Sequence, residues 1–245
     1  MDISLNKYIS DSGFCSRREA DKYIDDCRVT INGRDAQKGN RVKEGDEVRI
    51  DGEPLRKKKA PVYIAFNKPK GVTCTTDTKD KTNIIDFINY KTRIFPIGRL
   101  DKLSDGLIFL TNDGDIVNKI LRAGNGHEKE YIVMVDKPIN HEFINQMRNG
   151  VKIPGAITSK CFVKQEGEKK FRIILTQGLN RQIRRMCEAL DYKVITLTRI
   201  RIMNFNLTNI PPGKWRYFSP AELNTINEML KFSSKTADNG EGMGE

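Results

Sequence analysis

The sequence predicts an α+β protein in two parts: a small unit of helices and hairpins, then a larger unit with a mixed, mainly antiparallel sheet and flanking helices. Two observations support this fold class. In the first 53 residues, two short helical patterns precede apolar runs separated by turn dipeptides. From residue 61 onward strand and helix patterns alternate, and several strands follow one another without a helix between them.

The small unit is expected over residues 1–53. Apolar residues from Leu5 to Ile9 have helical spacing. Ser16 and Glu19 have the spacing of a capping box, which predicts the start of a second helix. The dipeptide Asn32-Gly33 follows an apolar run and predicts a hairpin turn.

The rest of the chain divides into a basic linker at 54–60, the larger unit at 61–231, and a polar tail at 232–245 that we expect to be disordered. The predicted strands of the larger unit lie near residues 62–66, 108–110, 131–135, 156–164, 171–176 and 194–207. Its predicted helices lie near residues 83–88, 116–123, 143–147 and 181–190.

Composition limits the class of protein. The chain has 245 residues and five cysteines without a CxxC pair, and only two histidines accompany them. This supports neither a disulfide framework nor a zinc site, and it indicates a reducing, cytoplasmic compartment. No apolar run approaches the ~20 residues that a membrane-spanning helix needs. We expect no metal and no membrane association.

Net charge indicates the kind of partner. The formal net charge is +11, and residues 61–230 carry 27 Lys and Arg against 17 Asp and Glu. A basic excess of this size favours a polyanion. Nucleic acid is favoured over a membrane surface, because no Lys-rich amphipathic helix with an aromatic face occurs.

Within this basic chain one acidic motif stands out. Gly98-Arg99-Leu100-Asp101 precedes a short apolar run typical of a buried strand. A carboxylate that faces a polyanion repels it, so its presence there suggests a chemical role. For the Arg-x-Asp triplet alone, a solvated surface turn is the simpler interpretation.

Further segments carry chemistry-bearing residues. A Pro- and Gly-containing loop follows the first strand of the larger unit and begins at Lys68, and Tyr131 begins another strand. Arg181, Arg184 and Arg185 fall at i, i+3 and i+4 in a predicted helix, and this spacing places them on one face.

The small unit resembles the S4-like RNA-binding fold through Leu5–Ile9, Gly13, Ser16–Ala20 and Ile31–Gly33. Cys27 departs from the family, which usually carries Gly between helix and strand at this position, so the local turn is expected to be altered or strained. Arg17 and Arg18 begin a helix, where backbone amides favour phosphate, although a solvated helix end is an equal alternative.

Taken together, the motifs of the whole chain resemble the bacterial ribosomal RNA pseudouridine synthases of the small-subunit-synthase type, and within that family the large-subunit synthase F branch. The motifs that carry this resemblance are 67–72, 98–101, 127–131 and 178–188. Leu103 departs from the family pattern, which has a polar residue there.

The resemblance implies a role for each residue. It assigns Asp101, Tyr131 and Arg184 to catalysis: Asp101 as the catalytic aspartate, Tyr131 as the residue that stacks on the target uracil, and Arg184 as the partner of the aspartate. It assigns RNA contacts to a second set: Arg99, Lys68, Arg181, Arg185, Arg17, Arg18 and Lys7.

The reaction suits these residues. Converting uridine to pseudouridine breaks the bond between ribose and uracil N1, turns the base and rejoins it through C5, so no cofactor is expected. Aspartate can attack a sugar carbon or take a neighbouring proton, and the sequence leaves both open. The target base must leave its stack, and an inserted side chain such as Arg99 would offset that cost.

We expect a monomer that acts on large-subunit (23S) ribosomal RNA. The alternatives are the same isomerase acting on a tRNA anticodon loop, and a non-catalytic RNA-binding assembly factor. Pure binding would not require Asp101, Tyr131 and Arg184 together, so the enzyme is favoured.

Overall fold

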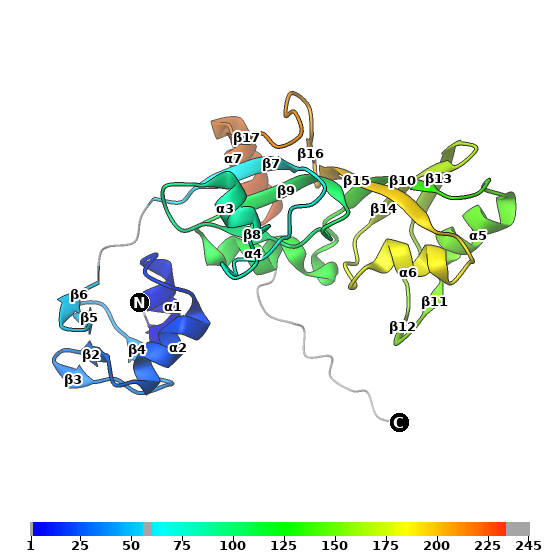
Figure 1. Cartoon of the computed structure of the whole chain (residues 1–245). Coiled ribbons are helices and arrows are strands. Elements are labelled where there is room, and N and C mark those ends of the chain that lie inside the picture. Colours follow the sequence, from blue (N-terminus) through cyan, green and yellow to red (C-terminus); the bar gives the residue numbers. More distant parts are fainter. Residues whose placement is uncertain (1, 56–59, 234–245) are drawn as a thin grey trace. The chain divides into compact units, whose positions relative to one another are not determined.

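The computed structural model describes residues 2–55 and 60–233, which form two compact units. The first consists largely of residues up to Val62, and the second largely of the residues that follow (Figure 1). The boundaries 1–53 and 61–231 remain predictions. The predicted linker falls partly, and the predicted tail mostly, outside the described residues.

The first unit contains two helices and short strands, and the capping box predicted for its second helix is present. Ser16 Oγ accepts a hydrogen bond from Glu19 N at 3.2 Å, and Glu19 Oε2 accepts one from Ser16 N at 2.7 Å. The elements are β1 Ile3–Ser4, α1 Leu5–Asp11, α2 Arg17–Asp25, β2 Val29–Ile31, β3 Arg34–Asp35, β4 Arg41–Val42, β5 Val48–Ile50 and β6 Glu53–Pro54.

Two features of this unit test the sequence analysis directly. Asn32 and Gly33 both have positive φ, 52° and 78°, as the predicted two-residue hairpin between β2 and β3 requires. Cys27 also has a positive φ of 54°. The turn between α2 and β2 is therefore left-handed without its usual glycine, at a cost of roughly 1–2 kcal/mol.

The second unit is built on one mixed sheet. Within the described residues the sheet has nine strands, in the order β13-β14-β10-β15-β9-β7-β17, and β16 and β8 pair with β15 and β9. Its strands are β7 Tyr63–Lys68, β8 Phe95–Ile97, β9 Asp105–Thr111, β10 Lys129–Val135, β13 Phe162–Gly167, β14 Lys170–Leu175, β15 Val194–Ile202, β16 Phe205–Asn206 and β17 Trp215–Tyr217. A separate hairpin pairs β11 Lys152–Ile153 with β12 Ala156–Ile157.

Most neighbouring strands are antiparallel, as predicted, but β15 and β9 are parallel and pair only through Thr198↔Asp105 and Arg199↔Gly106. A Cβ on Gly106, whose φ is +106°, would lie 2.2 Å from the carbonyl oxygen of Arg199. Glycine is therefore required where the two halves of the sheet meet.

Each half of the sheet has its own core. The helices are α3 Ile84–Ile88, α4 Gly114–Leu121, α5 His141–Asn149, α6 Gln182–Glu188 and α7 Pro220–Met229, with a 3₁₀ turn at Ala123–Asn125. Helices α4 and α7 pack on the half that contains β7 and β9, around Phe109 and Ile226. Helices α5 and α6 cover one face of the half that contains β10, β14 and β15 (Figure 1), around Phe143, Ile173 and Met186.

Helix α7 is not among the helices predicted above for the larger unit. Its signal is the capping box Ser219–Glu222 with Pro220 at the first helical position. Ser219 Oγ accepts from Glu222 N at 3.2 Å, and Arg216 forms an ion pair with Glu222.

Candidate active site

Asp101 lies in the loop between β8 and β9, within a turn that is held from both sides. Ser104 N donates to Asp101 O at 3.0 Å, which closes the turn, and Gly71 N donates to Lys102 O at 2.8 Å. Leu100 is buried beside it. These two hydrogen bonds stabilise the backbone conformation of the turn that carries Asp101.

Leu103 occupies the tip of this turn, with 66% of its surface exposed. Its side chain makes no demand on the fold, so a polar residue at this position would be accommodated equally well. The departure from the family pattern at Leu103 therefore lies at an exposed position of the turn.

Helix α6 brings Arg184 to the aspartate. Arg184 Nε lies 3.5 Å from Asp101 Oδ2, Nη2 donates to Ser104 Oγ at 3.1 Å, and Nη1 donates to Val194 O at 3.3 Å. The arginine is 7% exposed, and Ser104 is fully buried. The predicted contact between Arg184 and Asp101 is thus present, and the same guanidinium also donates to Ser104 at the end of the turn.

The three arginines of this segment do not share one exposed face. Helix α6 begins at Gln182, so Arg181 lies before its first turn with a left-handed φ of 50°. Arg184 is buried, whereas Arg181 is exposed and its Nη1 lies 3.9 Å from Asp101 Oδ2. The predicted common face is therefore wrong, because Arg184 turns inward to Asp101 and Ser104.

Arg185 is partly buried and lies against the β11–β12 turn. Its Nη2 donates to the carbonyl oxygen of Pro154, and its Nη1 donates to Asn180 O at 3.4 Å. Part of its hydrogen-bonding capacity is thus used within the chain. Its assignment to RNA binding remains a prediction.

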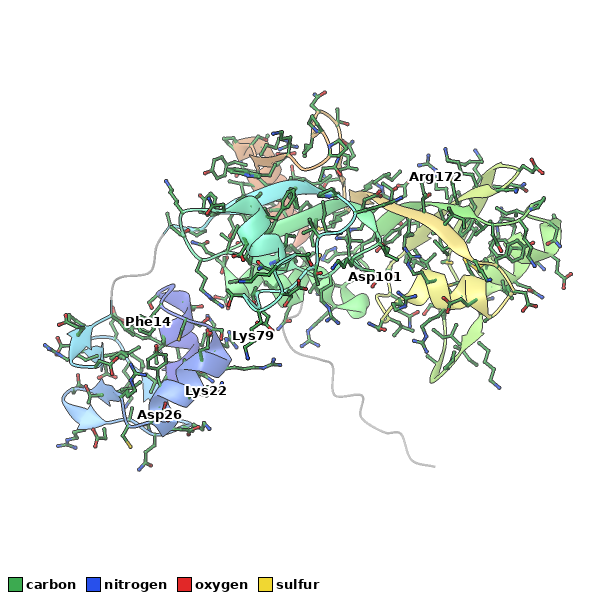
Figure 2. The ribbon with its side chains drawn as sticks, viewed as in Figure 1. Phe14, Lys22, Asp26, Lys79, Asp101 and Arg172 are labelled. Carbon is green, nitrogen blue, oxygen red and sulfur yellow. The ribbon has the colours of Figure 1, made fainter. Side chains whose placement is uncertain are left out.

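Asp101 and Tyr131 line the same pocket, which encloses about 440 Å³ of space open to solvent. Tyr131 stands on β10, where the register with β15 shifts between Glu130 and Tyr131. Figure 2 shows Asp101 in the central part of the larger unit, next to the start of α6. The pocket is lined by Arg99, Leu100, Asp101, Ser104, Tyr131, Leu175, Gln177, Gly178, Leu179, Arg181, Gln182, Ile183 and Leu197.

The residues that line the pocket combine apolar side chains with a few charged groups, as is usual for a site that binds a small molecule. Apolar walls come from Leu175, Leu179 and Leu197, and charged groups approach from the Asp101 side. Arg99 is exposed at the pocket, where its side chain is free to meet RNA.

The prediction that Lys68 contacts RNA is wrong. Lys68 is the last residue of β7 and is fully buried. Its ammonium donates to Val72 O at 2.9 Å and to Pro69 O at 3.0 Å, and burial lowers the pKa of the group. Lys68 therefore ties the 69–72 loop together, and that loop in turn holds Lys102 through Gly71.

The remaining RNA-binding assignments lie in the first unit. Arg17 and Arg18 are exposed in the first turn of α2, as the sequence predicts. Lys7 is half-buried on α1 and forms an ion pair with Asp11. The RNA-binding roles of these three residues remain predictions.

Two buried cations near the pocket, Lys129 and Arg199, are not predicted from the sequence. Lys129 and Arg199 are 6% and 4% exposed. Burial, followed by the nearby charge of Arg199, lowers the pKa of Lys129 to about 8. A charged residue within a strand pattern normally predicts an exposed position, so only the paired strands reveal these two cations.

The opposite face of the sheet carries a different charge network. Arg172 and Arg201 both form ion pairs with Glu130, and Arg201 also pairs with Glu128 at 2.8 Å. Burial would raise the pKa of Glu130, but the hydrogen bonds from Arg201 and Arg172 outweigh it and hold that pKa below its usual value. The positive charges of Arg172 and Arg201 are therefore paired with carboxylates of the same network.

The sequence model of RNA pseudouridylate synthases matches residues 62–189, and that of the S4 domain matches residues 4–48. The chain belongs to the RNA pseudouridylate synthase family. It is an RNA pseudouridine synthase with an N-terminal S4 domain. The family and the S4 domain are those that the sequence motifs indicate.

The chain is similar to two curated relatives and to one solved structure of the family. The dual-specificity RNA pseudouridine synthase RluF of Escherichia coli (strain K12) is 56% identical over 95% of this chain and 81% of its own length. The ribosomal large subunit pseudouridine synthase B of Bacillus subtilis (strain 168) is 32% identical over 92% of this chain and 96% of its own. A pseudouridylate synthase crystal structure superposes with a TM-score of 0.68 at 26% identity, covering 91% of this chain and 99% of that one.

The part of the chain that the structure describes offers neither a metal site nor a membrane span. Among residues 2–55 and 60–233, no group of three or more His, Cys, Asp or Glu side chains is arranged to hold a metal ion. In the same residues, no helix has both the length and the apolar character needed to cross a membrane.

Proposed function

We propose that this synthase converts a defined uridine of large-subunit ribosomal RNA to pseudouridine, with Asp101 acting at the ribose of the target nucleotide. One observation carries the assignment of the site. Asp101 and Tyr131 line one pocket, and the ion pair with Arg184 fixes the carboxylate at its edge.

Each residue has a role that follows from its position. Asp101 supplies the carboxylate that attacks ribose C1′ or removes the C2′ proton. Tyr131 offers a flat ring on which the extruded uracil stacks. Arg184 holds the carboxylate and, through Ser104, the turn that carries it. Arg99 at the pocket fills the gap that the extruded base leaves in the RNA.

The RNA substrate is inferred from charge and from relatives. The basic excess of the larger unit supplies phosphate contacts, and the S4 domain adds exposed arginines at a helix start. A relative 32% identical is named for the large ribosomal subunit, which favours that RNA. A second relative is named as a dual-specificity RNA pseudouridine synthase, so a second kind of RNA is considered. The alternative that the sequence motifs suggest is a tRNA anticodon loop.

The decisive experiment maps pseudouridines in ribosomal RNA and tRNA from cells with and without this protein. The expected result is one large-subunit position that is lost on deletion, restored by the wild-type gene, and not restored by Asp101→Asn. A position that Asp101→Asn restores would contradict the role of Asp101, and loss confined to tRNA would establish the alternative substrate. We also propose a cytoplasmic monomer, which light scattering of the purified protein tests for its oligomeric state.

A further inference from the structure

Arg199 has an unsatisfied buried donor close to the proposed site. The residue is 4% exposed and its Nε donates to Leu107 O at 2.7 Å. Its Nη2 is buried and has no hydrogen-bond partner among the described residues. A guanidinium carries five N–H donors, two of them on Nη2, and leaving these two without an acceptor in a low-dielectric interior is costly. Such a group calls for a functional explanation.

The strand register places Arg199 beside the proposed base-stacking residue. On β15, Arg199 is the direct partner of Tyr131 on β10, so the two side chains project from the same face of the sheet. This is the face that α6 covers, since the neighbouring Ile173 and Leu197 pack against it. Through Leu107 O, Arg199 also bridges to β9, the strand that follows the Asp101 loop.

Other cations lie near Arg199. Lys129 stands two residues before Tyr131, and the acceptors of its Nζ within residues 2–55 and 60–233 are the carbonyl oxygens of His127 and Thr176, at 3.1 and 3.4 Å. Lys68 is also buried with carbonyl partners. The carboxylates near these groups are Asp101, which is paired with Arg184, and Asp105, which lies 3.9 Å from Lys70. Among the described residues, neither Arg199 nor Lys129 forms an ion pair with a carboxylate.

This inference rests on the proposed function, because the reaction creates an anion at this place. When the C1′–N1 bond breaks, its electron pair goes to N1, and uracil departs as an anion. This holds whether Asp101 forms a bond to C1′ or removes the C2′ proton. The base then turns, C5 joins C1′ as the aspartate oxygen leaves or the C2′ proton returns, C5 loses its proton and N1 gains one.

We propose that Arg199, with Lys129 beside it, stabilises the detached uracil anion while it is stacked on Tyr131. Neither residue lines the pocket, so both act through their charge and not by contact. A buried positive potential suits a base that must turn, since a hydrogen bond to one ring atom would resist the rotation. Fixed charge beneath a developing anion is among the stronger sources of catalysis.

The test varies the leaving group and the charge separately. An RNA stem-loop carries either uridine or 5-fluorouridine at the target position, and fluorine makes the departing base a weaker base. Loss of the unmodified nucleotide is measured by nucleoside analysis in single turnovers at saturating enzyme. Arg199→Gln retains a donor for Leu107 O but loses the charge, and Arg199→Lys retains the charge. Arg172→Met is the matched control, because Arg172 pairs with Ile132 and its side chain therefore projects from the face opposite to that of Tyr131.

Arg199→Gln is expected to slow the uridine substrate on the order of 10²-fold, and the 5-fluorouridine substrate by at least tenfold less. Arg199→Lys should recover most of the loss, and Arg172→Met should stay within twofold of wild type on both substrates. Equal losses on the two substrates, or no loss, would overturn the proposal, because a purely structural role does not depend on the leaving group.

A second variant keeps the test decisive if the Arg199 variants do not fold. Lys129→Met should also lose more rate on uridine than on 5-fluorouridine, and equal losses would again contradict the proposal. Failure of the proposed function looks different: the wild-type protein would then leave the uridine unchanged.

Discussion

Arg184 holds both Asp101 and the end of the turn that carries it: its Nε lies 3.5 Å from Asp101 Oδ2, and its Nη2 donates to Ser104 Oγ at 3.1 Å. The arginine comes from α6, which packs on the half of the sheet that contains Tyr131, whereas the turn precedes β9 in the other half. One side chain therefore fixes the distance between the two sides of the pocket. A change at either end is expected to alter the reaction more than the binding of RNA.

Asp101→Asn should abolish isomerisation while RNA affinity stays within a fewfold of wild type. The amide keeps the shape of the side chain but cannot attack C1′ or accept the C2′ proton. Tritium release from C5-labelled RNA measures the reaction, and filter binding measures the affinity. Substantial turnover by the purified variant would remove Asp101 from its assigned role.

Arg184→Leu should slow the saturated reaction far more than Arg185→Leu, although the two residues are adjacent and carry the same charge. Arg184 is 7% exposed, and its loss removes one contact from Asp101 and one from Ser104, at an expected cost of about 2–3 kcal/mol, or roughly 30- to 150-fold in rate. The cost stays below that of a fully buried pair because the Asp101 side chain is 31% exposed.

Arg185 serves as the internal control for this comparison. Its loss should chiefly weaken RNA binding and reduce the slope of log affinity against log salt by about one unit. Single-turnover rates at saturating enzyme, together with a salt titration, distinguish the two effects. A larger rate loss in Arg185→Leu than in Arg184→Leu would show that the ion pair with Asp101 is not needed.

Lys68→Met should reduce the rate without changing the salt dependence of RNA binding. Lys68 is fully buried and its ammonium is bonded to Pro69 O and Val72 O, so its loss loosens the loop that holds Lys102 and removes no phosphate contact. The comparison is Arg181→Gln, whose exposed guanidinium is expected to contribute about one unit of salt slope. If the Lys68 variant lowers the slope instead, its ammonium reaches RNA by a rearrangement of the loop.

The double substitution of Arg17 and Arg18 by Gln should weaken RNA binding and leave the saturated rate unchanged. Both side chains are exposed in the first turn of α2, and the proposed reacting groups all belong to the larger unit. Lys43→Gln in the same unit is the control, because Lys43 is exposed outside the helix start. The measurement is the enzyme concentration at half-maximal single-turnover rate. A collapse of the saturated rate would mean that these arginines help to assemble the active site.

Local patterns in the sequence predict local structure well. They also predict those parts of the site whose residues belong to such a pattern. The capping box at Ser16, the hairpin at Asn32-Gly33 and the buried strand after Asp101 all depend on neighbouring residues, and all three are present. The pairing of Arg184 with Asp101 came only from the resemblance to a family, since nothing local indicates it.

What the sequence could not show depends on contacts between distant segments. Arg184 and Lys68 are charged residues at positions where spacing alone indicates exposure, yet both are buried. Their buried donors are accepted by oxygen atoms that the helix or strand pattern does not reveal: Ser104 Oγ for Arg184 and Val72 O for Lys68. The parallel contact of Arg199 with Gly106 joins strands more than 90 residues apart, and no periodicity predicts such pairing. The buried charge beneath the pocket becomes visible only once those strands are placed together.

Lys129 should make the larger unit more stable as the pH rises. A surface lysine in an ion pair has the opposite effect, because its stabilising charge is lost at high pH. Burial and the charge of Arg199 lower the pKa of Lys129 from 10.5 to about 8 in the folded protein. Between these values the unfolded chain binds a proton at Lys129 that the folded chain does not bind. The free energy of unfolding must therefore rise with pH across this window, and below pH 8 the buried charge reduces stability.

Lys129→Met removes this contribution, so its stability relative to wild type should be greatest near pH 7 and should fall as the pH approaches 10.5. The expected change in the difference is about 3 kcal/mol, from 1.36 kcal/mol per pKa unit. Urea unfolding followed by the fluorescence of Trp215, the single tryptophan of the chain, reports on the larger unit. Lys164→Met, at an exposed position on β13, is the matched control and should parallel wild type. A Lys129→Met curve that also parallels wild type from pH 7 to 10 would mean that the ammonium of Lys129 is solvated, and it would then contribute little to the positive potential beneath Tyr131.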